Sequence, residues 1–138
     1  MKPPSFKNES HVKKDVKKLL DKHNWFWWMT PANGYGKSGV ADFCAAKQGM
    51  FMVIETKANR NDPTPMQVGF LNSLRAADHF AFVVRETTMD AFGQFLDLLD
   101  KSIAYSAKGE VPPVHIGGPM LDAIQAMLTQ EKVKGTKI

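Results

Sequence analysis

The hydrophobic positions of this chain change their spacing several times, and each change marks an expected structural element. Segments in which apolar residues recur three to four positions apart are typical of amphipathic helices. Short runs rich in aromatic and β-branched residues indicate strands instead. The expected elements are, in order, a helix at 9–23, strands at 25–29, 40–46 and 50–57, a helix beginning at 64–65, a strand at 80–85 and a helix at 87–102.

Local signals support the connections between these elements. Lys47-Gln48-Gly49 offers glycine where a positive φ is needed, so the second and third strands should form a hairpin. Thr64 is a good N-cap, Pro65 suits the first helical position, and Gln67 lies where a capping box needs it. A strand that follows such a helix is expected to lie parallel to the strand before it. The sequence therefore predicts an α/β domain with a mixed sheet flanked by helices.

The length of 138 residues suggests one domain with enough chain to bury a core. We assign the domain to residues 1–102. Residues 103–138 are expected to form a C-terminal extension, because the stretch 104–119 carries three prolines and three glycines. A short amphipathic helix at about 120–130 and a charged tail should follow it.

Charge, hydropathy and cysteine content indicate which partners and which cellular compartment to expect. The net charge of +4 and the pI of about 9.2 favour a polyanionic partner such as nucleic acid. No apolar run approaches the roughly 20 residues that span a bilayer, so no membrane partner is expected. The N-terminus lacks the apolar segment of a secretory signal, and the single cysteine, Cys44, has no internal partner. Both features point to a reducing cytoplasm.

The third expected strand begins apolar and ends charged on one face. Alternation places Phe51, Val53, Glu55 and Lys57 together, and Asp42 on the neighbouring strand could reach the same end of the sheet. Two carboxylates and an ammonium at one strand end could bind a divalent metal ion and a phosphate. The alternative is an exposed strand end with a surface ion pair, worth roughly 0–1 kcal/mol.

The donor set suits Mg²⁺ or Mn²⁺, which prefer oxygen ligands. Asp42, Glu55 and the backbone carbonyl of Thr56 would be ligands, and Glu9 could add a third carboxylate if it faces inward. Glu9 could equally complement the dipole of the first helix. Lys57 would stabilise charge on the phosphate or orient the attacking water.

Three other segments each allow a structural and a functional interpretation. The lysines of the first helix are either solvated or contact phosphates. The aromatic run at 25–29 favours a core strand over a base-stacking platform. The glycine-rich loop at 30–38 is either a simple turn or carries residues that overhang the site. The candidate DNA contacts are Lys13, Lys14, Lys17, Lys18, Tyr35 and Lys37.

Several short motifs together resemble the VRR-NUC branch of the PD-(D/E)XK nuclease superfamily, in particular its small stand-alone bacteriophage members. The resemblance covers about residues 9–84. The motifs are Glu9-Ser10-His11-Val12-Lys13-Lys14, Pro31-Ala32-Asn33-Gly34-Tyr35-Gly36, Gly39-Val40-Ala41-Asp42-Phe43, Gly49-Met50-Phe51, Ile54-Glu55-Thr56-Lys57-Ala58 and Pro63-Thr64-Pro65-Met66-Gln67.

The resemblance implies a restriction-endonuclease-like core and a metal-dependent endodeoxyribonuclease. Asp42 and Glu55 would hold Mg²⁺ or Mn²⁺, Lys57 would be the catalytic lysine, and Glu9 would lie near the metal. Gln67 would reach the site from the second helix as well as capping it. The implied substrate is branched DNA such as a Holliday junction, the implied assembly is a homodimer, and a phage protein would act in the host bacterial cytoplasm.

The sequence departs from the family pattern at three places. Ala41 replaces the usual proline before the aspartate, which the superfamily tolerates, and Ala76-Ala77-Asp78-His79 replaces the usual small-residue turn before the last strand. Everything after about Thr87 lies beyond the matched core, which leaves the specificity for junctions open. The C-terminal extension could therefore recruit a partner protein. A catalytically silent nucleic-acid-binding or scaffold protein on the same fold is the alternative function.

Overall fold

The computed structural model describes residues 8–31, 40–58, 61–107, 126, 128 and 129. Its centre is a four-stranded sheet in the order β1-β2-β3-β4. The first three strands are antiparallel neighbours, and β4 runs parallel to β3, as the sequence predicted. The strands are β1 (Phe26–Met29), β2 (Phe43–Lys47), β3 (Met50–Thr56) and β4 (Phe80–Val84).

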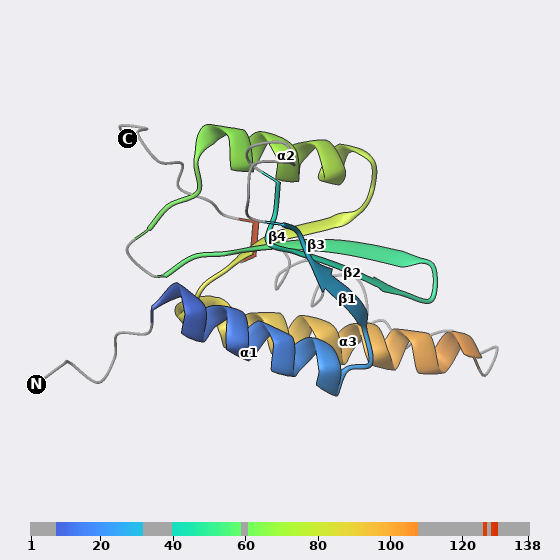
Figure 1. Ribbon diagram of the computed structural model, residues 1–138. Helices are drawn as coiled ribbons and strands as arrows, with labels where there is room; N and C mark the ends of the chain where they lie inside the picture. Colours follow the sequence, from blue (N-terminus) through green and yellow to red (C-terminus); the bar gives the residue numbers. More distant parts are fainter. Residues whose placement is uncertain (1–7, 32–39, 59–60, 108–125, 127, 130–138) are drawn as a thin grey trace, which may run out of the picture.

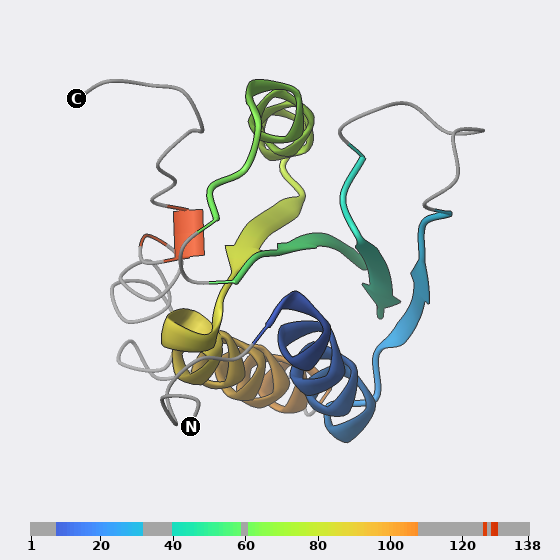
Figure 2. The same ribbon diagram turned by 60° about the vertical axis from the view of Figure 1, so that its left-hand side comes forward.

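Helices lie on both faces of the sheet (Figures 1 and 2). The helices are α1 (Glu9–Lys22), α2 (Pro65–Ala76) and α3 (Met89–Ala107), the last preceded by the 3-10 turn η1 (Glu86–Thr88). Figure 2 shows α1 and α3 side by side under one face and α2 alone over the other. The predicted class, an α/β domain with a mixed sheet, is confirmed.

The side chains on the two faces of β3 belong to different core clusters, and this determines the face on which Glu55 lies. Met52 and Ile54 belong to the larger core cluster beneath α1 and α3. Val53 belongs to the smaller cluster beneath α2, and Phe51 packs against it. Glu55 follows Val53 by two positions, so alternation directs it to the α2 face.

The predicted start of α2 is confirmed in detail. The Thr64 hydroxyl accepts from the backbone N–H of Gln67, and the Gln67 side chain accepts from the backbone N–H of Thr64. The spacing of apolar residues predicts a buried stripe of Met66, Phe70, Leu74 and Ala77 on this helix. Phe70 and Leu74 do pack against the smaller core cluster, but Leu71 is the buried residue and Met66 is 60% exposed. The helix therefore presents a slightly different side to the sheet than its spacing suggested.

The β2–β3 hairpin turns where the sequence placed it. Gln48 and Gly49 both have positive φ, at 46° and 82°. The Lys47 ammonium anchors this end of the sheet, because it donates to Asp100 on α3 at 2.8 Å and to the backbone carbonyl of His23 at 2.5 Å. The hairpin is thus held against α3, at the opposite end of β3 from Glu55.

The aromatic run in and before β1 is not the core strand that was predicted. Trp25 is buried and Trp27 is half-buried, but the other three side chains are exposed: Phe26 by 72%, Trp28 by 42% and Met29 by 38%. The physical reason is position. β1 is an edge strand, and α2 packs with β4 and the adjoining part of β3 rather than over β1.

The C-terminal prediction needs one correction. Helix α3 runs to Ala107, beyond the predicted end at Ser102 and into the stretch expected to be a linker. Of the helix predicted at 120–130, the structure describes Ala126, Leu128 and Thr129, which are helical, and Leu128 is buried in the larger core cluster. Within the part of the chain that the structure describes, no helix is long and apolar enough to cross a membrane.

Candidate functional site

The strand register brings the two predicted carboxylates face to face. Phe43 on β2 pairs with Ile54 on β3 in an antiparallel ladder. One step further along that ladder, Asp42 lies opposite Glu55. Thr30, directly after β1, continues the pairing on the other side of Asp42, because its backbone N–H donates to the Asp42 carbonyl at 3.0 Å. The candidate site therefore lies at the end of the sheet where β2 begins and β3 ends.

Asp42 is fixed by the strand opposite it. Its Oδ2 accepts hydrogen bonds from the backbone N–H of Thr56 at 2.9 Å and from the Thr56 hydroxyl at 2.7 Å. Two hydrogen bonds to one oxygen limit the rotation of the carboxyl group. Asp42 is therefore held in one orientation at the end of the ladder.

Glu55 is the buried carboxyl group at the centre of the site. The residue is 2% exposed, and its Oε2 accepts a hydrogen bond of 3.0 Å from Nε2 of Gln67. The same oxygen lies 3.5 Å from Nζ of Lys57, whose side chain is 14% exposed. Lys57 is held in turn, because its backbone N–H donates to the Val84 carbonyl at 3.1 Å and continues the pairing of β3 with β4.

Burial raises the pKa of Glu55 from its ordinary value of 4.5 to about 8. Repulsion from the Asp42 carboxylate adds to this effect, and Glu9 contributes in the same direction. The Lys57 ammonium opposes it without cancelling it. In the absence of a compensating cation, Glu55 is therefore protonated over much of the neutral range.

A divalent cation fits these residues. Oε1 of Glu55 is buried, and within the described residues it has no hydrogen-bond partner. An unsatisfied buried oxygen costs about 1–3 kcal/mol, which a bound cation would offset. Asp42 and Glu55 would hold the ion, and Mg²⁺ commonly needs only one or two carboxylates because it keeps several waters.

Glu9, the predicted third carboxylate, lies near the site but has its own partner. Its Oε2 is 3.4 Å from Nζ of Lys13 one helical turn later. Its position in the first turn also complements the helix dipole. Among the residues that the structure describes, no three acidic, histidine or cysteine side chains are grouped closely enough to hold a metal ion.

Gln67 serves both of the roles that the sequence left open. Its Oε1 accepts from the backbone N–H of Thr64 and completes the capping box at 2.8 Å. Its Nε2 donates to Glu55. The cap therefore fixes the amide so that its remaining donor points at the carboxylate.

The predicted DNA contacts are only partly described. Lys14 and Lys18 are exposed on α1, while Lys13 and Lys17 are half-buried. The other two candidates, Tyr35 and Lys37, lie outside the described residues, as does most of the stretch 103–138.

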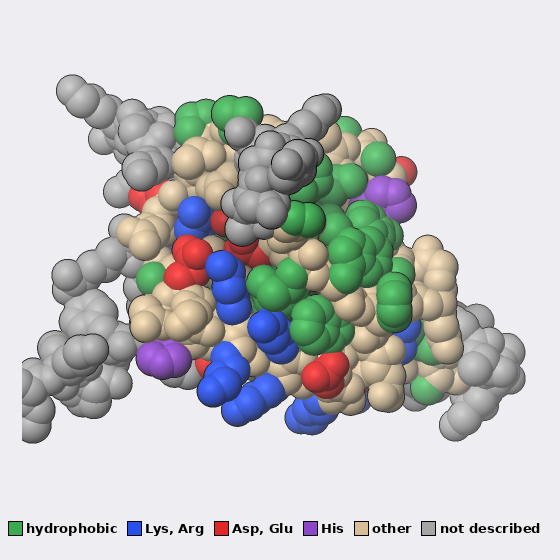
Figure 3. Space-filling model, viewed as in Figure 1, with side chains coloured by type: hydrophobic (Ala, Val, Ile, Leu, Met, Phe, Trp, Pro, Cys, Tyr) green, Lys and Arg blue, Asp and Glu red, His purple; other side chains and the backbone are tan. Residues whose placement is uncertain are grey.

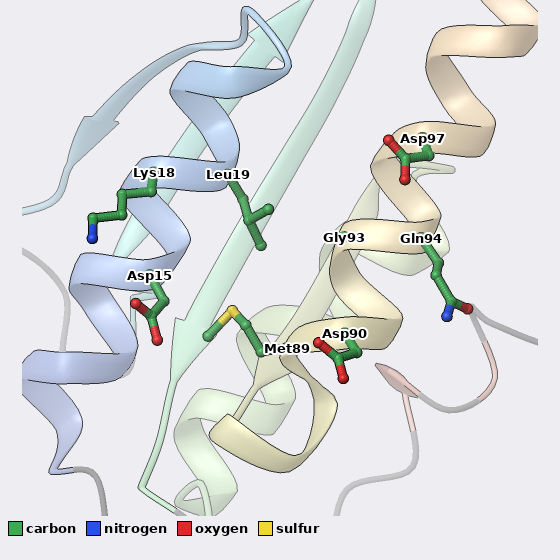
Figure 4. A pocket seen from close by; sticks show the side chains of 8 residues that line it. All are labelled: Asp15, Lys18, Leu19, Met89, Asp90, Gly93, Gln94 and Asp97. Atoms are coloured by element: carbon green, nitrogen blue, oxygen red, sulfur yellow. The ribbon is translucent and has the colours of Figure 1, made fainter.

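A hollow between α1 and α3 is a separate feature (Figure 4). Asp15 and Lys18 come from α1, and Asp90 and Asp97 from α3, with Leu19 between the helices. Three carboxylates against one ammonium make this hollow unfavourable for a polyanion. It contains neither Asp42 nor Glu55, so we place the candidate site elsewhere.

Three supporting residues were not anticipated from the sequence. Thr56 was expected to contribute only its backbone carbonyl, and Thr30 was assigned only to a loop. Arg85 clamps the segment after Lys57, because its guanidinium donates to the Ala58 carbonyl at 3.1 Å and to the Asp62 carboxylate at 3.1 Å. An arginine directly after a parallel neighbouring strand was the available signal for this clamp.

Comparison with known proteins leaves the family open. Neither a scan against family models nor a search of curated proteins finds a match to this chain.

The raised pKa of Glu55 predicts an unusual pH dependence of stability. Because the folded-state pKa exceeds the ordinary value, the stabilising contribution is fully present below 4.5 and is lost as the pH rises through about 8. In chelator, urea unfolding should show wild type losing on the order of a few kcal/mol between pH 6 and pH 9. Glu55→Gln should remove most of that slope.

Asp90→Asn is the matched control for this measurement, because Asp90 is an exposed carboxylate on α3 and is not among the groups that raise the pKa of Glu55. Its pH dependence should follow that of wild type. Equal slopes for wild type and Glu55→Gln would show that Glu55 titrates like an ordinary glutamate.

Proposed function

We propose that this protein is a metal-dependent endodeoxyribonuclease of the PD-(D/E)XK type, with the VRR-NUC branch as the nearest likeness. The observation that carries the proposal is the convergence on Glu55. Gln67 from α2 and Lys57, directly after β3, both contact it, and Asp42, directly before β2, is held at the same end of the sheet by Thr56. The order α-β-β-β-α-β of the first six elements is also the order expected of this superfamily.

Each residue has a distinct task in the proposed hydrolysis of a phosphodiester. Asp42 and Glu55 hold the cation, which when bound polarises the phosphate and lowers the pKa of a water. Lys57 lies beside Glu55 with its ammonium able to stabilise charge on the phosphate or to orient the water. Gln67 keeps the Glu55 carboxylate in one orientation. The likeness also suggests branched DNA as the substrate and a homodimer as the active form.

Cleavage assays test this proposal directly. Wild type should cut at least one DNA in a panel of junction, flap and duplex substrates when Mg²⁺ or Mn²⁺ is present. Glu55→Ala and Lys57→Ala should each lower the rate by about 100-fold or more, because Glu55 would hold the cation and Lys57 would stabilise charge on the phosphate.

Lys101→Ala is the control for Lys57→Ala, because Lys101 is exposed on α3 and follows Asp100, which binds the hairpin end of the sheet. It should cut at the wild-type rate. If no substrate is cut, or if all variants cut equally, the active-site assignment is wrong. Tight DNA binding without cleavage or manganese binding would favour the catalytically silent alternative.

Two substitutions in one capping box separate the structural role of Gln67 from its role in the site. Thr64→Ala removes the hydroxyl that caps α2, and Gln67→Ala removes the reciprocal amide. Both should lower stability by about 1 kcal/mol in urea unfolding. Gln67→Ala alone should also slow cleavage, since only Gln67 contacts Glu55. Equal cleavage activities of the two variants would show that Gln67 acts only as part of the helix cap.

The exposed lysines of α1 are proposed to contact DNA phosphates. Reversing Lys14 and Lys18 to glutamate should weaken duplex binding and flatten its dependence on salt, because each lost phosphate contact changes the logarithmic slope by about 0.9. Fluorescence anisotropy over a salt series measures this slope. Lys101→Glu is the control, and an unchanged slope in the α1 double variant would assign those lysines to solvation.

A further inference from the structure

The α2 face of the sheet carries exposed aromatic side chains that the proposed hydrolysis does not use. Phe26 is 72% exposed and Trp28 is 42% exposed, both on the edge strand β1. Their rings lie 5.7 Å apart, and Trp28 lies 6.3 Å from the half-buried ring of Phe51 on β3. Three neighbouring rings with two of them open to solvent are not a core cluster.

The register places these rings on the same face as the candidate site. Phe26 pairs with Ala46, and Ala46 pairs with Phe51. Trp28 pairs with Cys44, which packs against the smaller core cluster on the α2 face. Asp42 lies two residues before Cys44, about 7 Å along the strand direction from the level of Trp28.

The opposite face of β1 is already committed to packing. Trp27 points to the α1 side, where its Nε1 donates to Asp21 at 2.8 Å and its ring packs edge-on against Phe43. Met29, at the end of the strand, is 38% exposed on this face, but the two exposed aromatic rings of β1 both lie on the α2 face that carries Glu55.

The charge around this surface suits a polyanion. Figure 3 shows hydrophobic side chains gathered over β1, with Lys and Arg side chains beside them on the α1 side. The whole chain carries a net charge of +4. Aromatic rings flanked by cations are the arrangement by which proteins bind single strands, because every base offers a face for stacking and every nucleotide a phosphate.

We propose that Phe26, Trp28 and Phe51 form a stacking platform for unpaired bases of a single-stranded DNA segment that leads to the Asp42–Glu55 site. This proposal adds a substrate preference to the proposed function. It rests on that function only for the claim that the bound DNA leads to the Asp42–Glu55 site. The platform would favour substrates that carry an unpaired segment next to the scissile phosphate. Fully paired DNA offers no free base to these rings.

Binding in chelator tests the platform without any need for cleavage. Anisotropy of a labelled oligo(dT) should show Trp28→Ala and Phe26→Ala each binding roughly 5- to 100-fold more weakly than wild type, the range expected for loss of one stacked base. Affinity for a blunt duplex should change far less. Trp28→Phe should restore most of the single-strand affinity, since it keeps an aromatic face.

Met66→Ala is the matched control, because Met66 is also a large exposed apolar residue, 60% exposed, but lies on α2. It should bind oligo(dT) like wild type. Circular dichroism and thermal unfolding establish that the variants fold. Oligo(dT) should also quench tryptophan fluorescence in wild type, and Trp28→Phe should lose most of that quenching while retaining affinity.

Two results would overturn the platform. Wild-type oligo(dT) affinity in both alanine variants is one. The other is a change of both variants from dimer to monomer in sedimentation with oligo(dT) affinity retained, which would make the surface a self-association face. If the first result occurs together with cleavage that depends on Glu55 and Lys57, the platform is wrong and the nuclease assignment stands. Single-strand binding that depends on Trp28 without cleavage would do the reverse.

Discussion

The burial of the Glu55 carboxyl is the constraint on which the rest of the site depends. A carboxylate that is 2% exposed and lies opposite a second carboxylate is unfavourable unless cations or donors surround it. Gln67 and Lys57 supply part of that compensation. They leave Oε1 without a partner among the described residues, and this deficit is what a divalent cation would satisfy. In our account, the fold tolerates an unfavourable buried acid because the acid serves a function.

The scaffold around Glu55 is rigid for ordinary structural reasons. The β2–β3 ladder sets Asp42 opposite it, the capping box of α2 sets the Gln67 amide, and Arg85 ties down the segment after Lys57. Each of these devices also stabilises the local fold. A substitution in any of them is therefore expected to affect stability and the site together, which is why paired variants are needed to separate the two.

Much of this arrangement follows from the sequence alone. Alternation along β3 was enough to direct Glu55 and Val53 to one face, and Thr64-Pro65-Gln67 was enough to start α2. The environment of β1 did not follow, because aromatic residues have the same strand propensity whether or not a helix covers them. The burial of Leu71 instead of Met66 was also missed, since a small rotation of a helix is set by the surface against which it packs. The Thr56 hydroxyl was missed because alternation assigned it to the other face, whereas Asp42 precedes the first residue of β2 and can reach around the end of the ladder.

The most direct test of the central claim is a calorimetric titration of Mn²⁺ into the metal-free protein at a pH above about 8, where Glu55 is ionised. Our account predicts that wild type binds the ion, that Glu55→Gln and Asp42→Asn lose most of this affinity, and that Glu9→Gln retains more of it. Our account would be contradicted if wild type did not bind Mn²⁺, or if Glu55→Gln bound it as tightly as wild type. Either result would show that the buried Glu55 carboxylate is not a ligand of the cation.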